Sequence, residues 1–172
     1  GSAGISVLWP DVNNETFRDA LRDAESSDKP NNISPAIVYS LDEGVRALWL
    51  GDMENDYMEA IEDDIALSPV DILFAPHHGR KSGRVPKTWL DKLDPRLIVV
   101  GKAPSDELEY YSNYNTLTQN SAGDILFCCE ASKTHVYVGS PSYSVNFLDR
   151  DPNASVVKGS LYYLGSFDCG DR

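Results

Sequence analysis

Hydrophobic residues in this chain gather in short runs that stop abruptly at Gly, Pro or charged residues. Two such runs, residues 45–50 (VRALWL) and 71–75 (DILFA), break at Gly51 and Pro76 respectively. Apolar runs of this length that are closed by Gly or Pro are more typical of interior strands than of helices. We therefore expect both segments to be buried strands, and the polar residues that follow them to lie at the ends of those strands.

Further runs rich in branched and aromatic residues predict strands at residues 5–9, 36–41, 97–100, 124–129 and 134–138. The run at 36–41 is joined to 45–50 by a short turn that ends in Gly44, which predicts a hairpin. The runs at 124–129 and 134–138 predict a second, closing hairpin.

Apolar residues at helical spacing predict helices at residues 15–24, at residues 54–64 and after Pro86. Asn13 and Asn14 precede the first helix, and asparagine is a suitable N-cap. Proline is tolerated in the first turn of a helix, so Pro86 is expected there. The residues expected to face the core from this last helix are Trp89, Leu90 and Leu93.

In three segments the hydrophobic residues follow neither helical nor strand spacing clearly. Residues 26–32 form a polar linker, and residues 104–120 form a polar, tyrosine-rich stretch that is expected to be a long loop, either functional or mobile. The tail, residues 139–172, contains strand-like runs at 156–157 and 161–164, but its place in the fold does not follow from the pattern.

Length and composition point to an ordinary globular protein. The 172 residues suffice for one domain with a core, and 41% of them are hydrophobic and 24% charged. No apolar run reaches membrane-spanning length, and the first residues do not resemble a signal peptide, so we expect a cytoplasmic protein. Residues 1–4 are interpreted as a scar left by expression, which implies that the natural N-terminus is missing.

The formal net charge of -12 disfavours binding to a polyanion over the chain as a whole. Four basic residues nevertheless cluster after the histidine pair: Arg80, Lys81, Arg84 and Lys87. They form either a local positive rim or a solvated loop. The charge thus weakens a nucleic-acid hypothesis without removing it.

The cysteines do not suggest a disulfide framework. Cys128, Cys129 and Cys169 are odd in number and lack C-x-x-C spacing, which indicates a reducing compartment and packing roles. A thiolate metal site is not expected.

The polar residues after the two central strands are Asp52, His77 and His78. A carboxylate and imidazoles held at stiff strand ends would suit zinc, manganese or iron. Taken alone, Asp52 is better explained as the N-cap of the following helix, and the histidines as turn residues bonded to backbone or solvent. Their coincidence at two adjacent strand ends favours a site. His135, in the middle of a strand, is expected to be structural.

Several motifs in this order resemble the second half of a metallo-β-lactamase-fold hydrolase. They are Asn31-Asn32-Ile33-Ser34, Leu48-Trp49-Leu50-Gly51-Asp52, Pro76-His77-His78-Gly79-Arg80-Lys81-Ser82 and the strand Gly123-Asp124-Ile125-Leu126-Phe127. Within that family they are most similar to the hydrolase domain of bacterial DNA-uptake competence proteins and its free-standing relatives. The resemblance covers residues 5–138 and leaves residues 139–172 as an extension of unclear role.

The resemblance implies an α/β (α+β) fold, an αββα sandwich with metals held in loops at one sheet edge, of which this chain is the second half. It implies that Asp52, His77 and His78 bind divalent metal, zinc or manganese, with two ions in the completed site. One histidine would be metal-facing and the other available for proton transfer, in either order. Substrate contacts are implied for Lys81 and Ser82, and also for Asn32 and Ser34.

Two parts of the family pattern are absent from this sequence. The principal metal motif, H-x-H-x-D-H, belongs to the first half of the fold, and a later histidine in a G-H-P-S context is replaced by residues 109–115 (EYYSNYN). We therefore expect a partner, either a segment of the same native polypeptide or a second chain, that carries the first half. The abrupt start on a core strand favours this over a degenerate, inactive homologue.

The function implied is metal-assisted hydrolysis, in which metal-bound water is activated near neutral pH and a histidine protonates the leaving group. The most similar branch favours a phosphodiester substrate, hence a nuclease or phosphodiesterase. Hydrolysis of an ester, thioester or lactam on the same fold is the alternative within enzymes. A non-catalytic half-domain that binds or regulates a partner through an exposed apolar sheet face is the alternative outside them.

Overall fold

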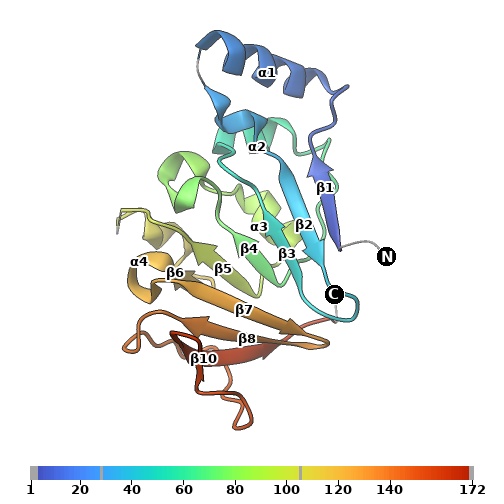
Figure 1. Ribbon diagram of the computed structural model, residues 1–172. Helices are drawn as coiled ribbons and strands as arrows, with labels where there is room; N and C mark the ends of the chain where they lie inside the picture. The colour runs from blue at the N-terminus through green and yellow to red at the C-terminus, as the bar shows by residue number, and fades with distance from the viewer. Residues whose placement is uncertain (1–3, 28, 105, 171–172) are drawn as a thin grey trace.

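Six of the short apolar runs pair into one mixed sheet, shown in the computed structural model in Figure 1. The structure describes residues 4–27, 29–104 and 106–170, so residues 1–3 of the expected expression scar lie outside it. In sheet order the strands are β1 (Ile5–Trp9), β2 (Ala36–Ser40), β3 (Arg46–Trp49), β4 (Ile72–Phe74), β5 (Leu97–Val100) and β6 (Thr116–Thr118). Strands β1 to β3 run antiparallel to their neighbours, and β3 to β6 are parallel. The hairpin predicted around Gly44 is confirmed as β2–β3.

A second sheet of four antiparallel strands lies against part of the first. Its order is β7 (Ile125–Glu130), β8 (Lys133–Val138), β10 (Leu161–Asp168) and β9 (Val157–Lys158). The predicted closing hairpin is confirmed as β7–β8. The tail, which the pattern left unplaced, supplies β9 and β10, and β10 pairs with β8 along most of its length. Residues after Val138 are therefore an integral part of the two-sheet body.

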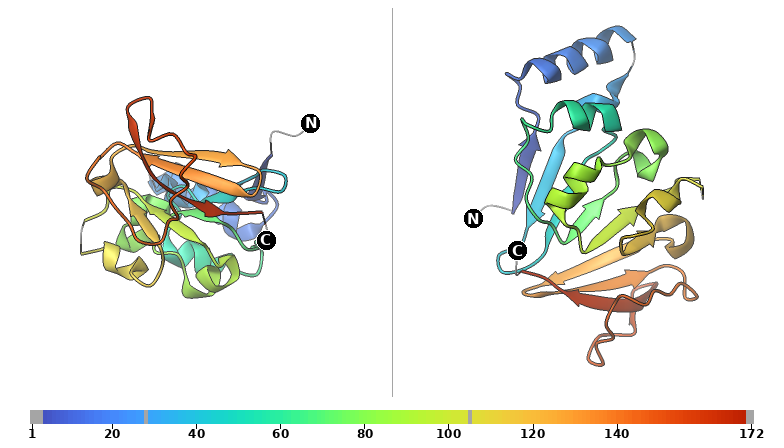
Figure 2. Two further views of the ribbon diagram at one scale, coloured as in Figure 1. Left: turned by 90° about the horizontal axis from the view of Figure 1, so that it is seen from below. Right: turned by 180° about the vertical axis from the view of Figure 1, so that it is seen from behind.

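Helices α2 (Asn55–Ala60) and α3 (Lys87–Leu93) lie on the face of the larger sheet that is turned away from the smaller one (Figure 2). Helix α1 (Glu15–Ser27) lies beyond the end of this sheet, and α4 (Gln119–Ala122) connects β6 to β7. Short 3-10 turns are η1 (Pro30–Ile33), η2 (Pro76–Gly79), η3 (Lys81–Gly83) and η4 (Leu108–Tyr111). Asn14 caps α1 as predicted, because its Oδ1 accepts the N–H of Phe17 at 3.1 Å. Within the described residues, no helix is long and apolar enough to cross a membrane.

Each face of the larger sheet has its own core. On the helical side, Val38, Leu48, Leu73 and Ile98 are buried beneath α2 and α3, in one core cluster with the predicted core residues Trp89, Leu90 and Leu93. On the opposite side, β3, β4 and β5 pack against inward side chains of the smaller sheet, such as Phe127. The chain is thus a mixed α/β protein with two stacked sheets and helices on one outer side.

Two elements differ from prediction. The predicted helix at 54–64 ends at Ala60 and continues as turns. The expectation of a plain loop at 104–120 is wrong, because this segment contains η4, β6 and the start of α4. Tyr111 in η4 is completely buried, and its hydroxyl oxygen accepts the N–H of Val85 at 3.2 Å. Burial of tyrosine rings therefore orders a segment whose polar composition suggested mobility.

Candidate functional site

The candidate site lies where β3 and β4 end. The two strands are parallel and adjacent, so their carboxyl ends reach the same edge of the sheet. Gly51 and Asp52 follow β3, and the turn η2 follows β4. The N–H of His77 donates to the carbonyl oxygen of Gly51 at 2.9 Å, which ties the two strand ends together. The segments that carry Asp52 and the histidine pair are therefore adjacent, as expected.

The loop that carries Asp52 is held by the asparagine-rich turn η1. Ser34 Oγ accepts the N–H of Asp52 at 3.0 Å, and Asn32 Oδ1 accepts the N–H of Glu54 at 3.0 Å. Gly51 has φ +60, and a Cβ there would lie 2.6 Å from Ser34 Cβ, so the turn requires glycine. Asn32 and Ser34, which the resemblance implied as substrate contacts, thus act here on the backbone that positions Asp52.

Asp52 does not cap the helix that follows it. Helix α2 begins at Asn55, and its N-cap residue is Glu54, which makes no side-chain capping bond. The capping interpretation of Asp52 is therefore wrong. The carboxylate is exposed to solvent at the strand end.

The histidine pair has an unusual backbone. His77 (φ 49, ψ 39) and His78 (φ 60, ψ 12) both lie in the left-handed region, and Gly79 follows with φ 86. Left-handed backbone costs a non-glycine residue about 1–2 kcal/mol, and such residues gather at sites where the surrounding structure imposes them. A Cβ at Gly79 would lie 2.4 Å from Val100 Cγ1, so the turn passes too close to β5 for any side chain there.

This conformation directs the two imidazoles into different surroundings. His77 Nδ1 lies 3.0 Å from Ser82 Oγ, and His77 lines a cavity of about 630 Å³. His78 lies against Gly101, where an added Cβ would be 3.1 Å from His78 Nδ1, and it lines a separate cavity of about 370 Å³. The two turns that carry Asp52 and the histidines are thus adjacent, as expected. The two imidazole rings, however, line separate cavities.

The cavity beside His77 is mixed in charge. Lys81 and Ser82, implied as substrate contacts, are in its wall together with Arg80 and three carboxylates. Its full lining is Glu54, Asn55, Asp56, His77, Arg80, Lys81, Ser82 and Glu107. Glu107 was not predicted from the sequence; its Oε2 accepts the N–H of Lys81 at 3.0 Å. No local pattern marks this glutamate, because its partner lies 26 residues earlier.

The cavity beside His78 is mostly apolar. Trp49 and Phe74 stack with ring centroids 4.4 Å apart and planes at 11°, and Phe127 from β7 meets Phe74 edge to face. These rings, with Val99 of β5 and Ile125 of β7, surround the opening that contains His78. The cavity therefore lies between the two sheets, at the edge formed by β7.

The residues that the structure describes do not by themselves fit a metal centre. Across residues 4–27, 29–104 and 106–170, no three or more His, Cys, Asp and Glu side chains are grouped so that they could hold an ion. Asp52 and His77 have suitable donor atoms, and a backbone hydrogen bond from His77 to Gly51 holds their two turns together. A metal centre at this edge would need further ligands.

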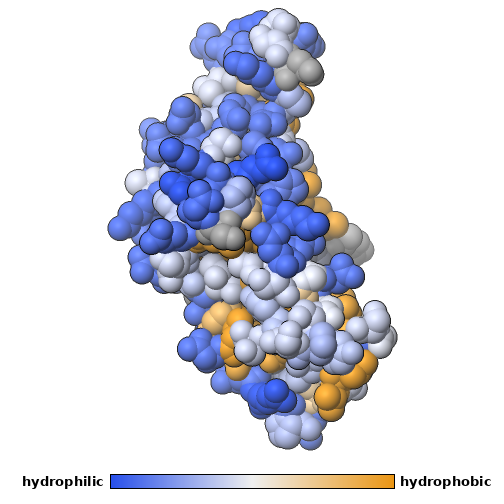
Figure 3. Space-filling view, turned by 90° about the vertical axis from the view of Figure 1, so that its left-hand side faces the viewer, coloured by the Kyte–Doolittle hydropathy of each residue, from blue (hydrophilic) through white to orange (hydrophobic). Residues whose placement is uncertain are grey.

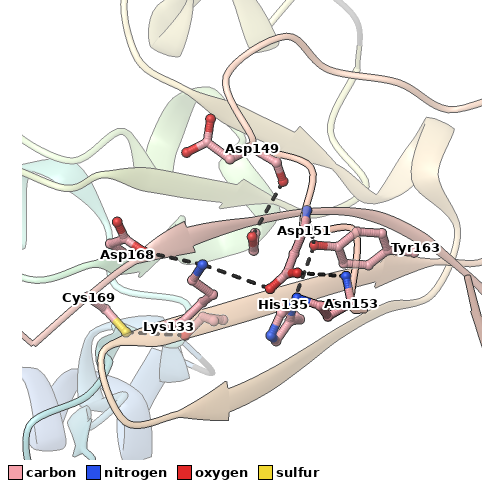
Figure 4. A network of polar contacts seen from close by, with 10 residues as sticks. Lys133, His135, Asp149, Asp151, Asn153, Tyr163, Asp168 and Cys169 are labelled. Atoms are coloured by element: carbon pink, nitrogen blue, oxygen red, sulfur yellow. Dashed lines mark hydrogen bonds and ion pairs between the residues drawn. The ribbon is translucent and has the colours of Figure 1, made fainter. Parts of the chain in front are cut away.

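His135 lies in a different place, within a polar network on the smaller sheet (Figure 4). Its Nδ1 is 3.4 Å from the hydroxyl of Tyr163, and that hydroxyl also accepts the N–H of Asp151 at 3.4 Å. Lys133 pairs with Asp151 at 3.9 Å and with Asp168 at 3.8 Å. These contacts fasten the loop before β9 to strands β8 and β10, which is a structural role.

Cys129 and Cys169 pack in the core between the two sheets, as expected of them. Cys128, Cys129 and Cys169 are free thiols, and Cys169 Sγ lies 3.6 Å from Thr134 Oγ1. Burial raises the pKa of Cys129 and of Cys169 above the usual value. Raised pKa values favour the protonated, unreactive thiol.

No protein-family model matches this chain, and no curated protein matches it.

Proposed function

We propose that this chain is the second half of a metal-dependent hydrolase of the metallo-β-lactamase fold, which acts on phosphodiesters once the first half is present. The first half would come from the same native polypeptide or from a second chain. It would supply the metal ligands that the described residues lack, the H-x-H-x-D-H motif in particular. Divalent zinc or manganese is the expected metal.

The layered architecture supports the proposal. A six-strand mixed sheet stacks on a four-strand antiparallel sheet, and helices cover the far face of the first. In our proposal these correspond to three successive layers of an αββα sandwich. The fourth layer, helices over the smaller sheet, would belong to the missing half.

The observation that carries the proposal is the pair of consecutive left-handed histidines at the end of β4. Two adjacent non-glycine residues in this region together cost about 2–4 kcal/mol. The bond from His77 to Gly51 and the close approach of Gly79 to Val100 impose the conformation. Backbone strain of this kind at the carboxyl end of parallel strands favours a functional site over an ordinary turn.

The Ser82 hydroxyl lies 3.0 Å from Nδ1 of His77, which leaves Nε2 as the nitrogen without that contact. When Nδ1–H donates to Ser82 Oγ, Nε2 retains its lone pair and can bind a metal or accept a proton. Asp52 follows Gly51, whose carbonyl accepts the N–H of His77, and its exposed carboxylate is available to bind the metal. His78, which lines the apolar cavity, is in our proposal the proton carrier rather than the ligand.

The phosphodiester is favoured over a carboxylic ester because Arg80 and Lys81 line the cavity next to His77. Cationic side chains suit a phosphate group, which remains charged throughout hydrolysis. The carboxylates in the same wall would repel a negatively charged substrate, so cations must balance their charge.

The test uses the tagged chain isolated from its natural source together with any polypeptide that co-purifies. With added Mn²⁺, the assembly should cleave bis(p-nitrophenyl) phosphate, and His77→Gln should lower the rate by about 100-fold or more. His135→Gln is the matched control and should leave the rate unchanged. Cleavage of p-nitrophenyl acetate but not of the phosphodiester would refute the substrate class.

A second candidate, a non-catalytic half-domain that binds a partner, is favoured by one observation. Large hydrophobic side chains are exposed on the larger sheet, among them Ile5, Val7 and Trp49. If the assembly contains a second polypeptide but neither metal nor hydrolytic activity, this candidate replaces the first.

A further inference from the structure

One row of apolar side chains crosses the entire larger sheet on the side of the smaller sheet. The register places one residue from each strand in line: Val7, Ile37, Trp49, Phe74, Val99 and Leu117. Exposure is highest at one end of this row and lowest at the other. Val7 is 61% exposed, Trp49 is 38% exposed, and Leu117 at the far end is 0% exposed.

A second, parallel row shows the same gradient. It runs through Ile5, Tyr39, Ala47, Ile72 and Leu97, and its exposure falls from 62% at Ile5 to 3% at Ala47. The smaller sheet therefore covers this face more closely over β4 to β6 than over β1 and β2, where Ile5 and Val7 remain exposed. The same apolar surface is core at one end and solvent-exposed at the other.

The smaller sheet stops at a strand that is free to pair. Strand β7 bonds to β8 in unbroken register from Ile125 to Glu130, and among residues 4–27, 29–104 and 106–170 no strand pairs with its other edge. Alternate β7 residues, Ile125, Phe127 and Cys129, point into the core between the sheets. A strand added to β7 would continue the smaller sheet over Trp49 and the open face.

From this geometry we infer that β7 is a docking edge. Its occupant is an extended strand of the polypeptide that supplies the missing half of the site. The inference rests on the proposed function for the identity of that partner. The first added strand pairs its backbone with β7 and turns alternate apolar side chains toward Trp49. Recognition by main-chain pairing with side-chain pockets at alternate positions is the usual mode at a free sheet edge.

The extent of the open face sets the size of the partner. Neighbouring strands lie about 4.8 Å apart, so the two intervals from β3 to β1 require about two added strands. A single strand would cover Trp49, and a second would be needed to reach Val7 and Ile5. The partner is therefore a hairpin or larger sheet element.

Charge disfavours a second copy of this chain as the occupant. Each copy carries a formal net charge of -12, so self-association would bring two strongly acidic bodies together. Figure 3 shows one face on which hydrophilic residues predominate and hydrophobic residues lie mainly along one margin and over the lower part. A neutral or basic partner with alternating apolar residues fits the open face better.

Docking on β7 would also complete the surroundings of His78. Ile125 and Phe127 of β7 share the apolar cavity with His78, Trp49 and Phe74. An added strand would close this cavity on its open side and bring partner residues next to the turn η2. The docking edge and the candidate site are thus one continuous region.

The test uses the full chain and a synthetic probe peptide of about eight residues, the length of one strand, in which valine alternates with threonine between flanking arginines. Hydrogen–deuterium exchange is followed with and without the peptide. We expect the amides of residues 125–130 to exchange at least about tenfold more slowly, and Trp49 fluorescence to shift. A peptide of equal composition with consecutive valines should have no effect.

A pair of double variants locates the docking face. Ile5→Thr with Val7→Thr removes exposed apolar surface from the open face without touching the buried core, and should weaken a two-stranded hairpin probe about fivefold or more. Val156→Thr with Val157→Thr, at 75% and 49% exposure at the start of β9, is the matched control and should leave binding unchanged.

Two results would overturn the inference: no protection of residues 125–130 by the alternating peptide, or equal loss of binding in both double variants. A concentration-dependent dimer of the chain alone that protects β7 would show that the occupant is a second copy, and would also overturn it. Protection of β7 in an assembly that neither binds metal nor hydrolyses phosphodiesters would sustain the docking edge and refute the proposed function instead.

Discussion

The amide of His77 is bonded to the carbonyl of Gly51 at 2.9 Å, so the turn after β4 is anchored to the turn after β3. This bond holds a strained histidine pair next to an exposed carboxylate. The following predictions test whether the turn, its hydroxyl partner and the surrounding core behave as this arrangement requires.

Gly79→Ala should destabilise the protein by at least about 2 kcal/mol. The residue has φ +86 and its Cβ would lie 2.4 Å from Val100 Cγ1, so alanine adds both backbone strain and a clash. Gly159→Ala is the control, because Gly159 has φ +63 but nothing within 4 Å of a Cβ; we expect a loss of about 1 kcal/mol. Urea unfolding of both variants measures the difference. Equal losses would show that β5 does not constrain the turn.

Ser82→Ala should release the ring of His77. The hydroxyl lies 3.0 Å from Nδ1 and is exposed, so its removal should change the free energy of unfolding by less than about 1 kcal/mol. Long-range ¹H–¹⁵N spectra should show the ring nitrogens of His77 shifting while those of His78 stay in place. Ser82→Thr keeps the hydroxyl and should preserve the native spectrum. Identical shifts of both histidines would contradict the separate surroundings of the two rings.

Tyr111→Phe should weaken the fold at neutral pH and flatten its alkaline pH dependence. The buried hydroxyl accepts the N–H of Val85, so its loss should cost about 1–2 kcal/mol. Burial raises the pKa of Tyr111 above the ordinary value of 10.0. The folded state thus keeps the proton, the unfolded state releases it above pH 10.0, and stability is lost as the pH rises past that value.

Denaturant titrations near neutral pH and at about pH 10 to 11 measure the alkaline effect. The native protein should lose up to about 1.4 kcal/mol per pH unit more than Tyr111→Phe, the contribution of a single proton. Parallel curves for the two proteins would show that Tyr111 ionises as easily when folded as when unfolded.

Asp71→Ala should destabilise the protein by about 3 kcal/mol. The carboxylate is fully buried at the start of β4, where Oδ2 accepts the N–H of Arg46 at 2.8 Å and Oδ1 accepts Nε–H of Arg96 at 3.0 Å. Asp19→Ala removes a carboxylate that pairs with Arg22 on the exposed surface of α1, and should change stability by less than about 0.5 kcal/mol. Thermal unfolding of both variants distinguishes them, and similar melting temperatures would contradict the role given to Asp71.

Local pattern was sufficient for most strands and for the order of the site segments. Short runs closed by Gly or Pro located β3 and β4 within a residue or two, and the strand at 97–100 was predicted at its observed limits. Most side chains of these strands are buried or half-buried on the two faces of the sheet, so their apolar composition is nearly continuous and easily seen. The sequence order alone also placed Asp52 and the histidine pair at neighbouring strand ends.

Other features depended on contacts between distant residues. The segment at 104–120 was misjudged because Tyr111 and Glu107 find partners more than 20 residues earlier, at Val85 and Lys81. Strand β10 was only partly visible since its pairing with β8 imposes order on residues such as Ser166, which is buried and polar. The divergence of His77 and His78 follows from left-handed backbone, which residue type and spacing do not specify.

The most direct test of the central claim is the metal content of the assembly isolated with its natural partner, measured by mass spectrometry of the bound elements. We predict zinc or manganese at one or two ions per chain in the native assembly. Asp52→Asn should reduce this by about tenfold or more without dissociating the partner. Unchanged metal content in Asp52→Asn, or an intact assembly that contains no metal at all, would contradict the account.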